Sequence, residues 1–432
     1  MMHPHPKEAE ARPLMHVAIV LLILILTYIG MAAGRIAWLQ VDRTGIALLA
    51  VIALLASGEM TLDDFGSAVD LPTLAFLFAM MIISAQFAES GFIDLCARTI
   101  TETRHGMATL LALTVAIGGG LSAILANDIL IIAISPLLIA GAQSRGLDPR
   151  PLMIALAAAT NAGSAATLIG NPQNILIGAL GRLDFWTFLA ICAVPAMFTL
   201  IVVFLVVWLQ WRTRISHTVL AATLDAPPIT LHPLDRNQTI KGAVAVLVLL
   251  VLFATPLPRE TGALIIAALL LASRKITSRT MIAAVDWPLL LLVACLFGIT
   301  GALNQSGVAA QILDFLTEHG LLPNSLMLLT PYSLLASNTI GGVPAAMLFL
   351  QLWPSAPPGV FYALALLSCL AGNLLLTGSL TNVLIAERAD RMGARLTFAE
   401  HARAGVPIAI ISIGFAVFWL AFTQTLPVLP ER

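Results

Sequence analysis

The sequence is poor in charged residues. Asp, Glu, Lys and Arg make up 10% of its 432 residues, whereas 59% are hydrophobic. A chain of this composition has too little polar surface to cover itself in water, which excludes a soluble globular protein. Its 22 basic and 23 acidic residues nearly cancel, so no nucleic-acid partner is expected. The composition predicts a protein that lies in a lipid bilayer.

Cysteine is scarce, and familiar catalytic motifs are missing. The four cysteines, Cys96, Cys192, Cys295 and Cys369, are widely spaced, so we interpret them as small core residues. The sequence contains no HExxH motif, no GxSxG motif and no paired membrane aspartates. An intramembrane enzyme, the alternative from a different functional class, is therefore disfavoured. No cofactor is predicted apart from Na+ or H+ as a coupling ion.

Long apolar stretches recur along the chain, and a helix needs about 20 residues to cross a bilayer core. They lie at about 14–33, 44–58, 71–88, 107–142, 151–180, 185–210, 240–257, 262–273, 287–304, 322–352, 360–386 and 405–428. The stretch at 14–33 follows Lys7 and Arg12 in the manner of a signal peptide. Its length and its counterpart in the second half indicate that it is retained.

The two halves of the chain match each other in order. Asp70-Leu71-Pro72 recurs as Asp286-Trp287-Pro288, and Ser90-Gly91 recurs as Ser306-Gly307, each displaced by 216 positions. We therefore predict an internal duplication. Its parts are an N-terminal tail at 1–13, a first repeat at 14–210, a cytoplasmic linker at 211–240 and a second repeat at 241–428.

Each half holds five predicted spanning helices and one stretch, 107–142 or 322–352, with a polar centre. Such a stretch is typical of a re-entrant hairpin whose tip lies inside the membrane, and the alternative is two full helices joined by a tight turn. Both return the chain to the same side, so five crossings per half make the second repeat inverted. The predicted fold is therefore an all-α membrane protein built from two inverted repeats, each with a broken helix.

Basic residues give the predicted orientation. With both termini outside, 17 of the 22 basic residues fall in cytoplasmic loops, including the central linker. The remainder are Lys7, Arg12, Arg182, Arg259 and Arg432. Because cytoplasmic loops are enriched in Lys and Arg, this bias supports the orientation. We expect a multi-pass protein of a bacterial inner membrane.

Asp128 is the only acidic residue deep inside an apolar stretch. A carboxylate there is costly unless it faces a cavity, an ion or a partner, and the alternative is a protonated acid hydrogen-bonded within the bundle. We predict that Asp128 and Asn127 take part in ion coupling. Ser337-Asn338-Thr339 forms the polar centre of the second hairpin and offers oxygens to a cation. The alternative is that these small polar residues only hold neighbouring helices together. No metal site beyond one for sodium is predicted.

Polar residues also interrupt the stretches at 151–180 and 360–386. Gly170 and Asn174 match Gly378 and Asn382 at a displacement of 208. Paired breaks of this kind point to a midplane site, because broken helix ends offer N–H groups to anions and carbonyls to cations. An accidental pair of kinks is the alternative. The predicted substrate-binding residues are Thr167, Gly170, Asn171, Pro172, Asn174, Thr377, Gly378, Ser379, Thr381 and Asn382.

These motifs resemble an ion transporter superfamily. The superfamily includes divalent-anion/sodium symporters, citrate-transporter-like permeases, arsenite pumps and sodium/proton antiporters. The resemblance rests on Asn127-Asp128 with Pro136, the break at 170–174 and Ser337-Asn338-Thr339, and it is nearest to the anion permeases. It implies a dimeric scaffold and a transport domain that moves like an elevator. In the divalent-anion symporters both tips read Ser-Asn-Thr, whereas Ala126-Asn127-Asp128 is more similar to the arsenite pumps and antiporters.

We therefore expect a secondary active transporter that moves a small anion, a di- or tricarboxylate or an oxyanion, coupled to sodium or protons. Proton-coupled arsenite efflux and sodium/proton antiport are the alternatives. No Lys or Arg lies in the predicted breaks, so helix N-termini and bound cations would have to balance the charge of the anion. The expected partners are this substrate, the lipid bilayer and, from the resemblance, a second copy of the chain.

Overall fold

The computed structural model describes residues 6–33, 41–103, 106–212 and 233–430, and the elements of these segments are helices. Their bounds are α1 Pro6–Ala33, α2 Arg43–Ala56, α3 Leu62–Ala68, α4 Leu71–Glu89, α5 Phe92–Thr101, α6 Met107–Ser122, α7 Asn127–Ser144, α8 Arg150–Ser164, α9 Pro172–Leu180, α10 Phe185–Trp211, α11 Arg236–Leu252, α12 Arg259–Leu271, α13 Ser278–Ala283, α14 Trp287–Gln305, α15 Val308–Glu318, α16 Leu326–Thr339, α17 Gly342–Leu352, α18 Pro358–Ala371, the 3-10 helix η1 Leu376–Gly378, α19 Leu380–Arg391 and α20 Phe398–Phe422.

Two predicted connections differ from the helix bounds. The first helix begins at Pro6, inside the predicted tail, and α11 begins at Arg236, inside the predicted linker. Residues 213–232 of that linker lie outside the described part of the chain. The boundaries of the two repeats stay predictions.

Six of the described helices are long and apolar enough to cross a bilayer. They are α1 from His16 on, α4, α7, α10, α14 and α20. Shorter apolar helices, α2, α6, α17 and α18, accompany them. Residue lengths and apolar composition thus confirm the prediction of an all-α membrane protein.

The helices of the second half begin at positions that match those of the first. Helices α2 and α12 begin 216 residues apart, as do α4 and α14. The cap of α4 also recurs: Asp70 Oδ1 accepts from Thr73 N at 2.9 Å, and Asp286 Oδ1 accepts from Leu289 N at 3.0 Å. An aspartate cap followed by proline in the first turn starts a helix firmly. These shared starts support internal duplication, while the inverted orientation stays a prediction.

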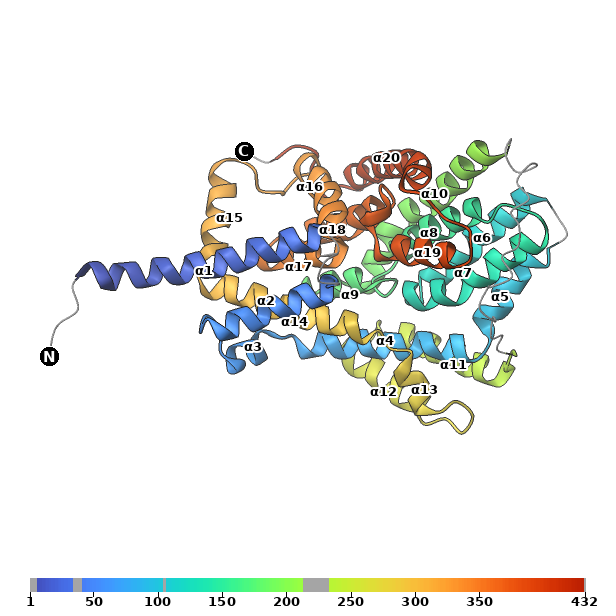
Figure 1. The fold of residues 1–432 in the computed structure, drawn as a ribbon, viewed down its shortest axis with the longest axis horizontal. Helices are drawn as coiled ribbons and strands as arrows, with labels where there is room; N and C mark the ends of the chain where they lie inside the picture. Colours follow the sequence, from blue (N-terminus) through green and yellow to red (C-terminus); the bar gives the residue numbers. More distant parts are fainter. Residues whose placement is uncertain (1–5, 34–40, 104–105, 213–232, 431–432) are drawn as a thin grey trace.

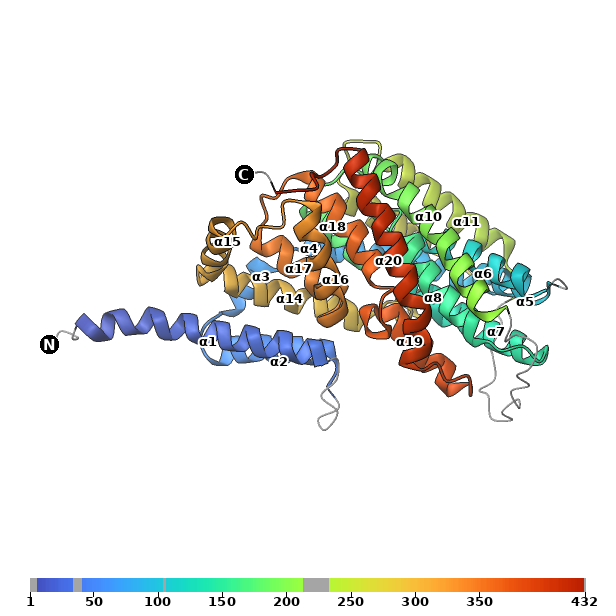
Figure 2. The same cartoon turned by 90° about the horizontal axis from the view of Figure 1, so that it is seen from above.

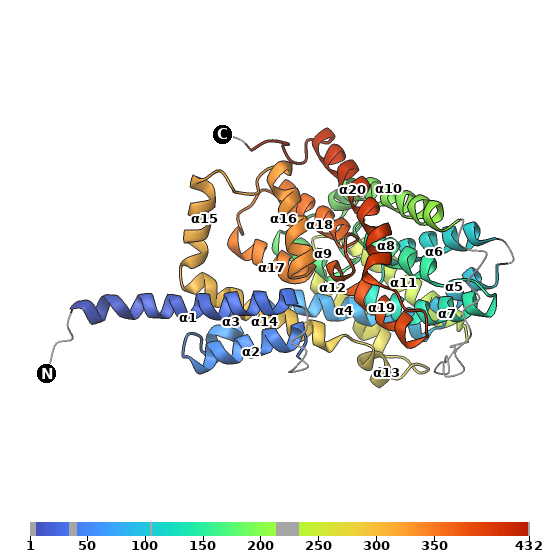
Figure 3. The same cartoon turned by 45° about the horizontal axis from the view of Figure 1, so that its top comes forward.

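The helices form two groups in space. In Figure 1, α2, α4 and α11–α14 lie along the lower side, and α8–α10 and α16–α20 lie above them. Within the lower group α4 packs on α12 and α2 packs on α14, and within the upper group α10 packs on α20. Figures 2 and 3 show α1 beside α2 and α14, with its N-terminal part extending beyond the other helices.

The two predicted hairpins differ at their tips. Helices α6 and α7 are joined through 123–126, whereas α16 and α17 are joined through Ile340 and Gly341, whose φ is +97°. The predicted polar residues stand at different places relative to the two turns. Asn127-Asp128 opens the second helix of its hairpin, whereas Ser337-Asn338-Thr339 closes the first helix of the other. The polar groups therefore lie on opposite sides of the two tips.

Helix lengths bear on the re-entrant path. Helix α17 has 11 residues and is therefore about 16 Å long, roughly half of a bilayer core. Helix α7 has 18 residues and is about 27 Å long, close to a full crossing. The second hairpin thus suits a re-entrant path better than the first, and the path of each stays a prediction.

Helices α6 and α8 are in backbone contact. A side chain at Gly163 would clash with the carbonyl oxygen and backbone of Gly119. Small residues allow such close approach of helices in membranes. This contact fixes the first hairpin to the helix that leads into the first break.

We expect Gly163→Ala to destabilise the protein by about 1–3 kcal/mol, because the added methyl group has no space between the two backbones. The midpoint of thermal unfolding of the purified protein in detergent measures this effect. Gly120→Ala is the matched control, since nothing lies within 4 Å of a side chain added there. Equal midpoints for both variants would contradict the close packing.

Candidate functional site

The first break lies between α8, which ends at Ser164, and α9, which begins at Pro172. Asn174 Nδ2 donates to the carbonyl oxygens of Ser164 and Thr167, both at 3.0 Å, and Asn171 Oδ1 accepts from Asn174 N at 2.7 Å. Carbonyls at the end of a helix otherwise lack partners. The break predicted at Gly170 to Asn174 is therefore present, and Asn174 stabilises it.

The second break repeats this arrangement. Helix α18 ends at Ala371, and after η1 the chain continues as α19 from Leu380. Asn382 Nδ2 donates to the carbonyl oxygens of Gly372 at 2.8 Å and Leu375 at 3.1 Å. These acceptors lie 10 and 7 residues before the asparagine, as they do in the first break. The two breaks are equivalent in hydrogen bonding, which argues against an accidental pair of kinks.

Each break is also held by the opposite half of the chain. Cys369 Sγ donates to Asn174 Oδ1 at 3.2 Å, and Asn161 Nδ2 donates to Asn382 Oδ1 at 3.1 Å. Both amide hydrogens and the amide oxygen of each break asparagine are thus used within the protein. Asn161 and Cys369 are 208 positions apart, yet the sequence prediction missed them because their side chains differ.

The caps of α9 and α19 complete the link between the breaks. Asn171 Nδ2 donates to Cys369 Sγ at 3.1 Å, and Ser379 Oγ donates to Asn161 Oδ1 at 3.0 Å. Each cap residue therefore contacts the helix of the other half that leads into the other break. The N-termini of α9 and α19 are thus each held against the opposite half of the chain, and a helix N-terminus carries a partial positive charge that favours an anion.

The first hairpin tip packs on the first break. Thr167 Oγ1 donates to the carbonyl oxygen of Ala123 at 2.5 Å, and Ser122 Oγ lies 2.5 Å from both Asn127 Oδ1 and the carbonyl oxygen of Thr160. Asn127 is buried by these contacts. The predicted residues Asn127 and Thr167 thus lie in one layer of the site.

Asp128 is half-buried in the first turn of α7. Its carboxylate accepts no hydrogen bond from the described residues. The alternative, a protonated Asp128 hydrogen-bonded within the bundle, therefore has no hydrogen-bond partner for this side chain among the described residues. The positive end of the α7 dipole is the nearest compensation that the helix geometry provides.

The second hairpin tip faces the second break. Asn338 Nδ2 donates to the carbonyl oxygen of Ala371 at 2.9 Å, while Asn338 Oδ1 lies where a side chain at Gly378 would be. Asn338 Oδ1 and Ser337 Oγ are buried without hydrogen-bond partners among the described residues. Thr339 is exposed, and its hydroxyl donates back into its own helix. Two oxygens at this tip are therefore free to bind an ion, because buried polar atoms are normally paired.

A cation contributed by α2 lies at the same tip. A Cβ atom at Gly341 would lie 2.9 Å from a guanidinium nitrogen of Arg43, whose Nε donates to the carbonyl oxygen of Met31 at 3.3 Å. Gln173 Oε1 lies against Gly342 on the other side. Arg43 was not predicted as a site residue, because it lies far in sequence from both breaks and both hairpins. Arg259 stands 216 positions later, at the start of α12.

The remaining predicted substrate residues lie around the breaks with different exposure. A side chain at Gly170 would meet the carbonyl oxygen of Ser164 at 2.5 Å, which leaves room for glycine only. Pro172 is the first residue of α9, where a missing N–H is harmless. Thr381 is buried and Thr377 is exposed.

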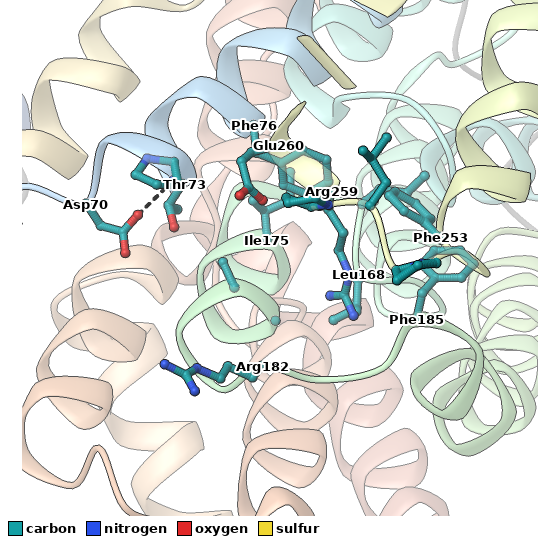
Figure 4. Close-up of a pocket in the computed structure, with 17 residues that line it drawn as sticks. Asp70, Thr73, Phe76, Leu168, Ile175, Arg182, Phe185, Phe253, Arg259 and Glu260 are labelled. Carbon is teal, nitrogen blue, oxygen red and sulfur yellow. Dashed lines mark hydrogen bonds between the residues drawn. The ribbon is translucent and has the colours of Figure 1, made fainter. Parts of the chain in front are cut away.

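A cavity of about 590 Å³ adjoins the first break. Leu168 and Ile169 of the break line it together with the end of α9, the start of α4 and the start of α12. Figure 4 shows its polar side chains, Asp70, Thr73, Arg182, Arg259 and Glu260, around the turn that follows α9.

Comparisons with known proteins match this chain to a transporter family and to membrane proteins, some of them named as transporters. A family model described as a citrate transporter matches residues 19–359. A 46 kDa membrane protein of Mycobacterium leprae is 28% identical, covering 93% of this chain and 97% of that protein. An uncharacterized transporter of Synechocystis sp. is 26% identical, covering 82% and 86%. The P protein of Homo sapiens is 26% identical, covering 88% of this chain and 57% of that protein.

The fold has a solved counterpart. The crystal structure of the YdaH transporter of Alcanivorax borkumensis aligns with a TM-score of 0.55 and 16% sequence identity, covering 99% of this chain and all of that one. At this identity the likeness concerns the fold alone. Because transporters match along most of the chain, the intramembrane-enzyme alternative is discarded. The chain is a multi-pass helical membrane protein, and the family model matches it over residues 19–359. The chain therefore belongs to the citrate transporter family.

Proposed function

We propose that this protein is a secondary active transporter that moves a small anion, a di- or tricarboxylate or an oxyanion, by coupling it to sodium ions or protons. The observation that carries this proposal is the pair of equivalent breaks, in which the cap residue of each following helix is bonded to the opposite half of the chain. The N-termini of these helices favour negative charge without a basic side chain. The family of the chain supports the same class of substrate.

We assign the substrate to the backbone and caps of the breaks, with Arg43 as an added counter-charge. The N-terminal turns of α9 and α19 begin at Pro172 and Leu380, and Ser379 and Asn171 stand at their caps. Thr167, Gly170, Thr377, Gly378 and Thr381 complete the predicted set. Because all hydrogen-bonding groups of the Asn174 and Asn382 side chains are used within the protein, we give these two residues the role of positioning the helix ends.

The coupling ion is assigned to the two hairpin tips. Ser337 Oγ and Asn338 Oδ1 are unpartnered oxygens of the kind that a sodium ion needs, and Thr339 is placed beside them. Asp128 supplies a carboxylate that can bind sodium or exchange a proton. Movement of the site is assigned to the upper helix group of Figure 1 sliding against the lower group, as an elevator within a homodimer. Both termini are assigned to the outside and the linker to the cytoplasm.

The test of this function is transport by the reconstituted protein in liposomes. Dicarboxylates, citrate, inorganic oxyanions and arsenite are offered in turn under imposed sodium and proton gradients. Gradient-driven accumulation of a carboxylate or an oxyanion is expected. Movement of arsenite alone would favour arsenite efflux, and exchange of sodium for protons without any solute would favour antiport.

We expect Asp128→Asn to abolish ion-coupled uptake, because the amide keeps the size of the side chain and loses the group that carries charge. Uptake under a gradient and the amount of folded protein in the membrane are measured together. Asp314→Asn, at an exposed position of α15, is the control and should transport normally. Coupled uptake by Asp128→Asn at the unmutated rate would refute the assignment.

We expect Ser337→Ala to raise the half-saturating concentration of the coupling ion by about 10-fold, which corresponds to about 1.4 kcal/mol. Ser333→Ala is a matched control, because Ser333 lies one turn earlier on α16 and its hydroxyl is also buried without a partner. If Ser337 were only an unsatisfied polar group, its replacement would stabilise the protein and leave ion dependence unchanged. The thermal midpoint of both variants separates these two results.

A further inference from the structure

The cavity beside the first break extends from the end of α9 and the starts of α4 and α12 to Leu168 and Ile169 of that break. Its outer part is formed by the turn after α9, the residues before α12 and the start of α4, and Leu168 and Ile169 form its wall toward the break. Its volume of about 590 Å³ is that of a small-molecule pocket. The elements that line its outer part all end or begin there, so the cavity lies at one end of the helical bundle.

Arg182 is the cation of this cavity that the protein leaves uncompensated. It is exposed, and its guanidinium forms no hydrogen bond or ion pair with the described residues. Its backbone has φ +50°, a left-handed conformation that few residues other than glycine adopt. Strained positions of this kind gather at functional sites. In Figure 4 the Arg182 side chain extends from the turn after α9, away from Arg259.

The second arginine is already engaged. A guanidinium nitrogen of Arg259 donates to the carbonyl oxygen of Leu183. The negative charge of the Asp184 carboxylate also attracts the Arg259 guanidinium. Hydrogen bonds from the Thr187 backbone and hydroxyl lower the pKa of Asp184, so this carboxylate is ionised. Arg259 therefore has a resident counter-charge.

The two carboxylates that line the cavity are compensated as well. Asp70 caps α4 by accepting from Thr73 N at 2.9 Å, and Glu260 stands in the first turn of α12. Helix N-termini stabilise negative charge at these positions. The charge of Arg182 is therefore the one left to act on a solute.

We propose that this cavity is a vestibule that collects anions, through Arg182, and delivers them to the first break. The ligand class is a small carboxylate or oxyanion. The transport experiment described below rests on the function proposed above. The vestibule provides the basic side chain that the breaks lack, at a place the substrate meets before the site. Leu168 and Ile169 separate the vestibule from the break and exclude bulk water from it.

The charge of the vestibule is tested without transport by labelling an introduced cysteine. Ala179 lines the cavity at the end of α9, and Ala179→Cys adds a single sulfur atom to it. The purified protein in detergent is treated with an anionic and a cationic methanethiosulfonate reagent of similar size, and the unmutated protein gives the background from its four cysteines. The measured quantity is the ratio of the two labelling rates.

Arg182→Asn should lower the anionic-to-cationic rate ratio at Cys-substituted Ala179 several-fold, and Arg182→Lys should keep it. Asparagine is chosen because it tolerates the left-handed backbone of this position. An unchanged ratio in Arg182→Asn, or a cysteine that reacts with neither reagent, would overturn the vestibule.

The transport arm uses the anion that the unmutated protein moves in liposomes. Arg182→Asn should raise its half-saturating concentration several-fold at low salt, leave the maximal rate unchanged, and lose this effect as salt screens the charge. Arg279→Asn, an exposed arginine of α13, is the control and should change neither value. If Arg279→Asn matches Arg182→Asn, the vestibule is refuted. If the unmutated protein moves no anion, the proposed function fails, and the labelling ratio still decides the charge of the vestibule.

Discussion

A helix that breaks inside a bilayer exposes carbonyl and N–H groups that water cannot reach, and the centre of this protein is arranged around that constraint. Both breaks meet it with one asparagine whose amide donates to two carbonyls at the same spacing. In the proposed function, the N–H groups at the starts of α9 and α19 are the hydrogen-bond partners of the anion. The backbone groups exposed at the two breaks thus serve both the fold and the proposed recognition of the anion.

The site is assembled from pieces that the fold brings together one by one. The first hairpin is held to the first break by Thr167 and Ser122, and the second hairpin is held to the second break by Asn338. Gln173 touches the second hairpin from the first half. A displacement of one hairpin would therefore act directly on the helix end beside it, and in the proposed function this contact links the coupling ion at a tip to the anion at a break.

The sequence predicted the parts of this arrangement that depend on local chemistry. Apolar length predicted the spans, Asp70 and Asp286 marked equivalent helix starts, and the glycine and asparagine pairs marked both breaks. It did not predict contacts that depend on packing. Arg43 lies far from the second hairpin in sequence, and the tips turn at different places relative to their polar residues because Gly341 supplies a left-handed turn.

The cross-links between the breaks have a consequence for how the two halves have diverged. Asn161 and Cys369 occupy equivalent places but hold the opposite asparagine with different chemistry, an amide in one case and a thiol in the other. Under the predicted internal duplication, a half-length ancestor that paired with itself would have carried the same residue at both places. Once joined in one chain, the two places could differ, and this pair is an asymmetry that a symmetric dimer could not have kept.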